Sequence, residues 1–74
     1  MNVLGFTVTS AIESACLERM RAGWFTAALI AETAYGLGVP FAKDYRVAER
    51  LIQRERKAGN IVRHGKGWLW KKRA

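Results

Sequence analysis

The sequence has few of the residues that form cross-links, metal centres or catalytic groups. Its 74 residues include one cysteine and one histidine, which excludes an internal disulfide and a cysteine zinc cluster. Cys16 has helical spacing from Ile12 and Met20, which predicts a small core residue. His64 has no partner at nucleophile or metal spacing, so we expect no catalytic or metal-binding role for it.

Carboxylates are also few: the chain has six Asp and Glu residues. They form no HExxH motif, no pair suited to acid–base catalysis and no calcium loop. Gly65 and Gly67 indicate a turn, since no helix is predicted after them to complete a phosphate-binding loop. The sequence therefore predicts that the protein is not an enzyme, and it indicates no cofactor and no small-molecule ligand.

Long apolar runs are missing, although half of the residues are hydrophobic. No run reaches the about 18 apolar residues of a membrane-spanning helix. The start MNVLGFTVTSAIES also lacks the basic and apolar regions of a secretory signal. We expect one small domain without membrane association and a cytoplasmic location.

Positive charge is present in excess and lies in the second half of the chain. Residues 1–42 have two basic and three acidic residues, and residues 43–74 have eleven basic and three acidic residues. The halves therefore have net charges of −1 and +8, within an overall +7. A single basic run is usually only a solvated face, but such asymmetry is typical of a polyanion-binding surface. Nucleic acid is the favoured partner.

The strongest helical pattern spans residues 40–58. At about 100° per residue, one side is apolar and consists of Phe41, Val47, Ala48, Leu51 and Ala58. The opposite side is a basic row, defined here as Arg46, Arg50, Gln53 and Lys57. Pro40 suits the first turn, Asp44 complements the helix dipole, and Gly59-Asn60 is a C-terminal stop. Tyr45 falls nearer the apolar side, and we expect it in the core or at its boundary.

Two shorter helices are predicted before this one. Ser10 followed by Glu13 fits a capping box that opens a helix over residues 11–22. Its inner face would consist of Ile12, Cys16, Leu17 and Met20. After the extended pair Trp24-Phe25, Thr26 can cap a second helix over residues 27–35. The segment Gly36-Leu37-Gly38-Val39 then forms a turn to the basic helix, because glycine permits positive φ.

The pattern becomes extended after the basic helix. Two β-prone runs, residues 60–63 and 68–71, flank the tetrapeptide 64–67 and predict a hairpin. Trp68 and Trp70 share one strand face, and we expect them to pack on the helices. Stacking of these rings on an exposed base is the alternative.

The chain divides into three segments. Residues 1–9 are an arm or edge strand, residues 10–71 are the domain, and residues 72–74 are a basic tail. The apolar N-terminal segment is compatible with an edge strand, with a segment packed over the core, or with an arm that binds a partner. The sequence alone leaves these alternatives open.

In this order the segments resemble the winged helix-turn-helix family. The resemblance covers residues 10–71 and rests on TAALIAE (26–32), RVAERLI (46–52), KAGNIVR (57–63) and GWLW (67–70). It implies a mainly α fold with a small β-hairpin (α+β), in which three helices precede a hairpin wing. The chain departs from the family's usual serine- or threonine-rich start of the third helix, because it has GLGVP there.

The resemblance also implies where DNA would bind. The third helix would enter the major groove, and the wing would follow the backbone or the minor groove. The implied contacts from the helix are Lys43, Arg46, Arg50, Gln53 and Lys57, and those from the wing and tail are Arg63, His64, Lys66, Lys71, Lys72 and Arg73. Arg46 and Arg50 are expected to read bases, because a guanidinium can bond both O6 and N7 of guanine.

The expected function is sequence-specific or architectural binding of double-stranded DNA. The protein would be a small bacterial or phage transcriptional regulator or an excisionase-like protein, and we expect a homodimer because one small module reads few bases. Two alternatives stay open. One is a winged-helix module that docks on an acidic protein partner, and the other is single-stranded nucleic acid binding through Trp68 and Trp70.

Overall fold

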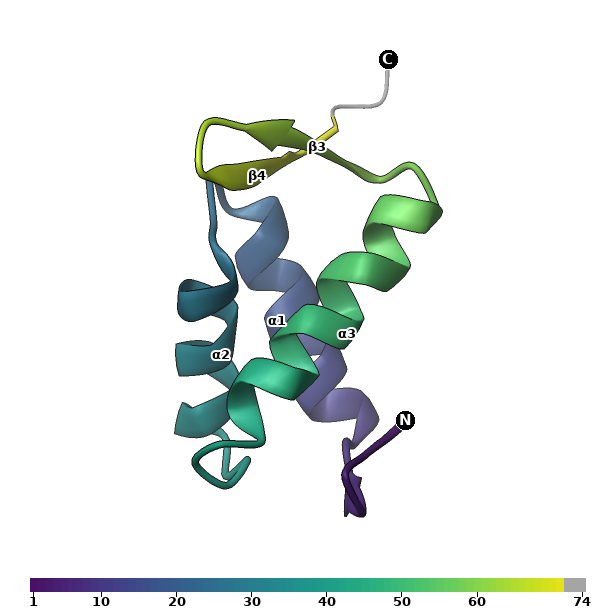
Figure 1. The fold of residues 1–74 in the computed structure, drawn as a ribbon, viewed down its shortest axis with the longest axis vertical. Helices are drawn as coiled ribbons and strands as arrows, with labels where there is room; N and C mark the ends of the chain where they lie inside the picture. Colours follow the sequence, from purple (N-terminus) through teal and green to yellow (C-terminus); the bar gives the residue numbers. More distant parts are fainter. Residues whose placement is uncertain (72–74) are drawn as a thin grey trace.

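Three helices and two β-hairpins form the computed structural model, which describes residues 1–71 (Figure 1). The helices are α1 (Ser10–Arg21), α2 (Ala27–Gly36) and α3 (Asp44–Lys57). The N-terminal hairpin consists of β1 (Asn2–Val3) and β2 (Phe6–Thr7). The second hairpin, called the wing below, consists of β3 (Ile61–His64) and β4 (Gly67–Trp70). This is the predicted α+β fold with three helices and a hairpin.

The core lies between the three helices, and α3 passes in front of α1 in the view of Figure 1. The helices contribute the buried residues Ile12, Cys16, Met20, Ile30, Ala31, Ala34, Val47, Ala48, Leu51 and Ile52. The predicted inner face of α1 is thus confirmed, with Leu17 half-buried at the edge. On α3 the prediction is confirmed for Val47, Ala48 and Leu51, whereas Ala58 follows the helix as its C-cap and is exposed. The core fixes the rotation of α3, so the side of this helix that bears the basic row faces solvent.

The N-terminal caps follow the prediction at α2 but not at α1. The Thr26 hydroxyl accepts from the Leu29 N–H at 3.3 Å and caps α2, as predicted. At α1 the capping box is wrong, because the N-cap is Thr9, whose hydroxyl accepts from the Ile12 N–H at 3.3 Å. Thr9 has extended backbone and Ser10 is already helical. Glu13 is one residue too far from this cap to close the box, and it binds elsewhere.

Glycine ends both α2 and α3 in the same way. After α2, Gly38 has φ 99° and the Val39 N–H donates to the Ala34 carbonyl at 3.2 Å. After α3, Gly59 has φ 79° and the Asn60 N–H donates to the Glu55 carbonyl at 3.0 Å. Each is a Schellman motif, in which glycine takes the left-handed conformation without a steric penalty.

The start of α3 differs from the prediction. The helix begins at Asp44 and not at Pro40, because Ala42 has φ 74° and breaks the helical path. The Pro40 carbonyl instead accepts from the Lys43 N–H at 3.0 Å in a tight turn. Phe41 therefore does not join the apolar side of the helix but is 81% exposed. Tyr45 also lies outside the core, with 50% of its surface exposed.

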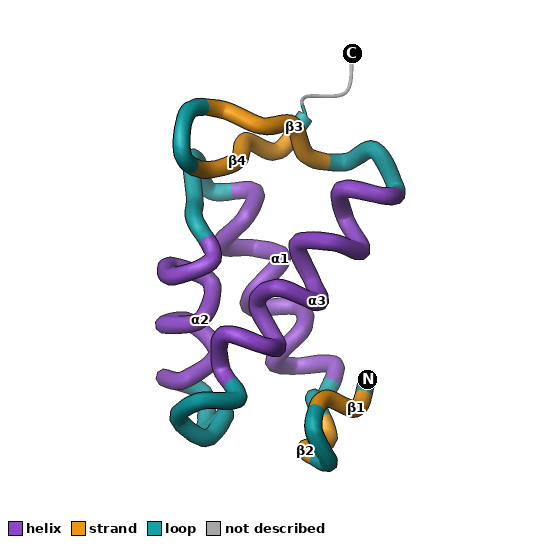
Figure 2. The backbone as a smooth tube through the Cα atoms, viewed as in Figure 1, coloured by secondary structure: helices purple, strands orange, loops and turns teal. Residues whose placement is uncertain are grey.

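The wing is an antiparallel hairpin that closes one end of the helical bundle (Figure 2). Its turn is the pair Gly65-Lys66, shorter than the predicted tetrapeptide, and Gly65 has φ 61°. Phe25 adds a bridge to β4, since its N–H donates to the Trp68 carbonyl at 3.1 Å and its carbonyl accepts from the Trp68 N–H at 2.8 Å. The predicted extended stretch before α2 thus serves to attach the wing.

The N-terminal hairpin lies at the opposite end of the molecule from the wing (Figure 1). Val3 and Val8 are buried in the core, and Phe6 packs against it. Of the three alternatives for the first residues, packing over the core is the one observed.

Candidate nucleic-acid interface

The basic row of α3 is exposed along the length of the helix. Arg46, Arg50, Gln53 and Lys57 all face solvent, as the helical spacing predicts. Lys43 lies outside the regular helix, at its N-cap position, and is half-buried. The row therefore consists of four side chains on one rigid element, with Lys43 beside its first turn.

Most of this row is not engaged in the fold. Within residues 1–71, Arg46, Arg50 and Lys57 form no side-chain hydrogen bond and no ion pair. Gln53 accepts a hydrogen bond from Arg56 Nε at 2.9 Å. The positive groups of the row are thus available to an external anion without breaking an internal contact.

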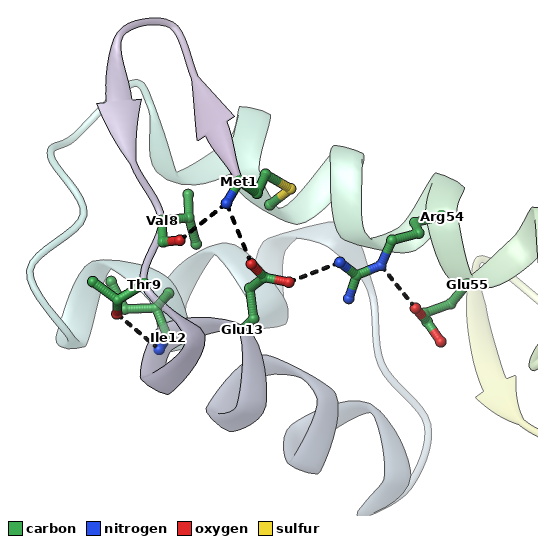
Figure 3. A network of polar contacts seen from close by, with 7 residues as sticks. All are labelled: Met1, Val8, Thr9, Ile12, Glu13, Arg54 and Glu55. Carbon is green, nitrogen blue, oxygen red and sulfur yellow. Dashed lines mark hydrogen bonds and ion pairs between the residues drawn. The ribbon is translucent and has the colours of Figure 1, made fainter.

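Arg54 differs from the basic row because two carboxylates bind it (Figure 3). Its guanidinium lies 2.7 Å from Glu13 on α1 and 3.1 Å from Glu55 on its own helix. The hydrogen bond from Arg54 lowers the pKa of Glu13 below its ordinary value, against the opposing effect of burial. The same bond raises the pKa of Arg54. Arg54 therefore ties α3 to α1.

The predicted contacts of the wing are at its exposed edge and turn. Arg63, His64, Lys66 and Lys71 are all exposed. Arg63 also lies over the Trp68 ring, with its guanidinium carbon 5.1 Å from the ring centre. Lys72 and Arg73 lie outside the described residues.

Trp68 and Trp70 contribute to the core and are not open aromatic platforms. Both are half-buried and pack against the core cluster, as predicted. Arg21 of α1 covers Trp70, with its guanidinium carbon 4.8 Å from the ring centre. Because each ring already has an arginine over it, stacking of a base there would require the arginine to move.

Trp24 holds the wing turn in place, a role that sequence reasoning missed. Its indole Nε1 donates to the His64 carbonyl at 2.9 Å. Gly67 lies directly against it, and a Cβ at this position would meet the Trp24 ring at 2.6 Å and the Phe25 carbonyl oxygen. The sequence predicts a turn glycine here, but Gly67 lies in β4, where this close approach requires it. No local sequence pattern links residues so far apart in the chain.

Two further residues share the exposed side of α3 with the basic row. Glu49 lines one shallow hollow together with Arg46, Arg50 and Gln53. Arg56 reaches the same side through its bond to Gln53. Glu49 precedes Gln53 by four residues, and residues four apart are neighbours on a helix surface. The position of Glu49 beside the basic row was therefore predictable from the sequence.

Neither the cysteine nor the metal-ligating side chains of the described residues form a competing site. Cys16 is fully buried, and burial raises the pKa of its thiol to about 11, so it is an inert core residue. Among residues 1–71 there is no group of three metal-ligating side chains, and none of the helices there has the length and apolar character needed to cross a membrane. Comparisons with protein-family models, curated proteins and solved structures gave no match.

Proposed function

We propose that the protein binds double-stranded DNA through the outer side of α3 and the wing. The observation that supports this most is that Arg46, Arg50 and Lys57 are exposed on one helix and unpaired within residues 1–71, in a chain with net charge +7. The major groove is about 12 Å wide and admits one helix. Exposed basic groups on the wing add attraction for phosphates on either side of that groove.

Duplex DNA is favoured over a single strand by the state of Trp68 and Trp70, the two tryptophans on which single-strand binding was expected to rely. Single-strand binding relies on aromatic rings that are open to successive bases. Trp68 and Trp70 are half-buried and lie beneath Arg63 and Arg21. A helix with free arginines suits groove binding better, and a small transcriptional regulator or architectural protein is the role that this binding mode fits.

The test is a double substitution on the basic row, Arg46→Ala with Arg50→Ala. Each arginine is expected to contribute about 1–3 kcal/mol of base discrimination, so affinity for a selected duplex should fall at least about 30-fold. The matched control is Ala11→Glu with Ser14→Glu, at two exposed positions of α1, which lowers the net charge of the chain by the same amount. Equal losses in both variants would contradict the proposed binding face, provided that circular dichroism shows both to be folded.

A second candidate function, contact with another protein, is favoured by one observation. Tyr35, Phe41 and Tyr45 form an exposed aromatic cluster around a hollow between α2 and α3, with Ala28 and Ala31 also lining it. Exposed aromatic residues around a pocket are typical of protein interfaces. Self-association through this cluster would give the predicted homodimer. Sedimentation of the DNA complexes of the wild type and of Phe41→Ser tests this. The wild type should bind DNA as two copies and the variant as one, and an equal number of protein copies per duplex in both would contradict it.

A further inference from the structure

A carboxylate lies in the middle of the basic side of α3. Glu49 is exposed and lines the hollow formed by Arg46, Arg50 and Gln53. It follows Arg46 by three residues and precedes Gln53 by four, so these side chains are neighbours on the helix surface. Any ligand that reaches both arginines also meets this carboxylate.

Contacts within the fold do not explain Glu49. It forms no side-chain hydrogen bond and no ion pair within residues 1–71, although two arginines are nearby. Glu55 on the same helix is different, because it is buried and bound by Arg54 and Asn60. The carboxylate of Glu49 is therefore available to an external donor.

A carboxylate at this place is unfavourable for a surface that only attracts phosphates. It repels phosphate oxygens, which provide nearly all of the affinity in non-specific binding. In the major groove, the donor that a carboxylate can bind is the N4 amino group of cytosine, just as O6 and N7 of guanine suit arginine. A surface that presents both arginine and carboxylate groups is thus suited to base pairs that offer guanine acceptors and a cytosine amino group.

We infer that Glu49 accepts a hydrogen bond from a cytosine that lies beside guanines bound by Arg46 and Arg50. This inference rests on the proposed function, in which α3 occupies the major groove. The two arginines are about 6 Å apart along the helix axis, which corresponds to about two base steps. The site read by this part of α3 is therefore a run of two or three G·C pairs.

The test is selection of duplexes from a random-sequence pool by the wild type, by Glu49→Ala and by Glu49→Gln. The wild type should select guanines and one cytosine. Replacing that cytosine should weaken the wild type by about five- to a hundred-fold, and should leave Glu49→Ala almost unaffected. Glu49→Gln should shift the preference at this position towards adenine, because glutamine pairs with N6 and N7 of adenine. Glu18→Ala, an exposed carboxylate on α1, is the matched control and should keep the wild-type preference.

Two results would overturn the inference while the proposed function stands. In one, the wild type binds duplexes without any cytosine preference. In the other, Glu49→Ala loses discrimination at the guanines and keeps it at the cytosine, which would make Glu49 a positioning residue for the arginines. Absence of duplex binding by the wild type would instead contradict the proposed function itself.

Discussion

Gly67 is the single residue on which the position of the wing depends most directly. Its Cα lies so close to Trp24 and Phe25 that a methyl group would overlap both. We predict that Gly67→Ala destabilises the protein by about 1–3 kcal/mol, the usual cost of overpacking. Chemical denaturation followed by tryptophan fluorescence measures this.

Gly36→Ala is the control for that substitution. Gly36 lies at the end of α2, and a methyl group added to it would meet no other atom within 4 Å. Alanine there should be neutral or stabilise by up to about 1 kcal/mol. Equal destabilisation by the two alanines would show that the close approach at Gly67 does not constrain the wing.

Glu13 gives the stability of the fold a defined pH dependence. Because Arg54 lowers its pKa, the ionised form is favoured in the folded protein, and this stabilisation is complete above the ordinary pKa of 4.5. It is lost as the pH falls through the lower pKa of the folded state. The Arg54 side chain is 45% exposed, so screening limits the effect of Glu13→Gln to about 0.5–1 kcal/mol at neutral pH.

Urea denaturation of the wild type and Glu13→Gln at pH 7 and pH 3 measures this dependence. The difference in unfolding free energy should shrink at the lower pH, where the carboxylate becomes protonated. Glu18→Gln, which changes an exposed and unpaired carboxylate among the described residues, should show no such change. A difference for Glu13→Gln that stays constant with pH would contradict the role of its charge.

At the scale of the elements, the turn before α3 holds an alanine in a conformation that favours glycine. Ala42 has φ 74°, which corresponds to the third position of a type II turn. Glycine removes the steric cost there but gives the unfolded chain more freedom, so Ala42→Gly should stabilise by up to about 1 kcal/mol. Thermal denaturation measures this, and a fall in melting temperature would argue against the observed turn.

The sequence predicted the elements better than their ends. The helical period of the apolar residues and the glycines that end the helices predicted α2, α3 and the wing, because these signals lie in the local sequence. The predicted start of α3 was wrong because Pro40 suits both a first helical turn and a tight turn. No neighbouring residue indicates that Ala42 takes the left-handed conformation. The predicted cap of α1 was wrong because Thr9 and Ser10 are both residue types that can cap a helix, and the sequence alone does not distinguish them.

The candidate site was predictable to the same extent. Helical spacing alone identified Arg46, Arg50, Gln53 and Lys57 as one exposed row, and it also contained the position of Glu49. The clamp between Trp24 and the wing was not predictable, because its partners are forty residues apart in the chain. Helical spacing likewise cannot predict which arginines form ion pairs within the fold. The structure shows that Arg54 forms such pairs and that Arg46 and Arg50 do not, within residues 1–71.

At the scale of the whole molecule, the separation of charge along the chain becomes a separation in space. The basic half of the sequence forms α3 and the wing, while the nearly neutral half forms α1, α2 and the N-terminal hairpin that support them (Figure 1). Lys43, Lys57, Arg63, Lys66 and Lys71 are available for phosphates in addition to the arginines expected to read bases. The affinity for duplex DNA should therefore depend strongly on salt.

The most direct test of DNA binding is a titration of a labelled mixed-sequence duplex at several salt concentrations. About five phosphate contacts predict a slope of about −4.5 for the logarithm of the association constant against the logarithm of salt concentration. A slope between about −3 and −6 would agree with binding by α3 and the wing together. Absence of binding at low salt, or a slope near zero, would contradict the proposal that this basic surface binds DNA.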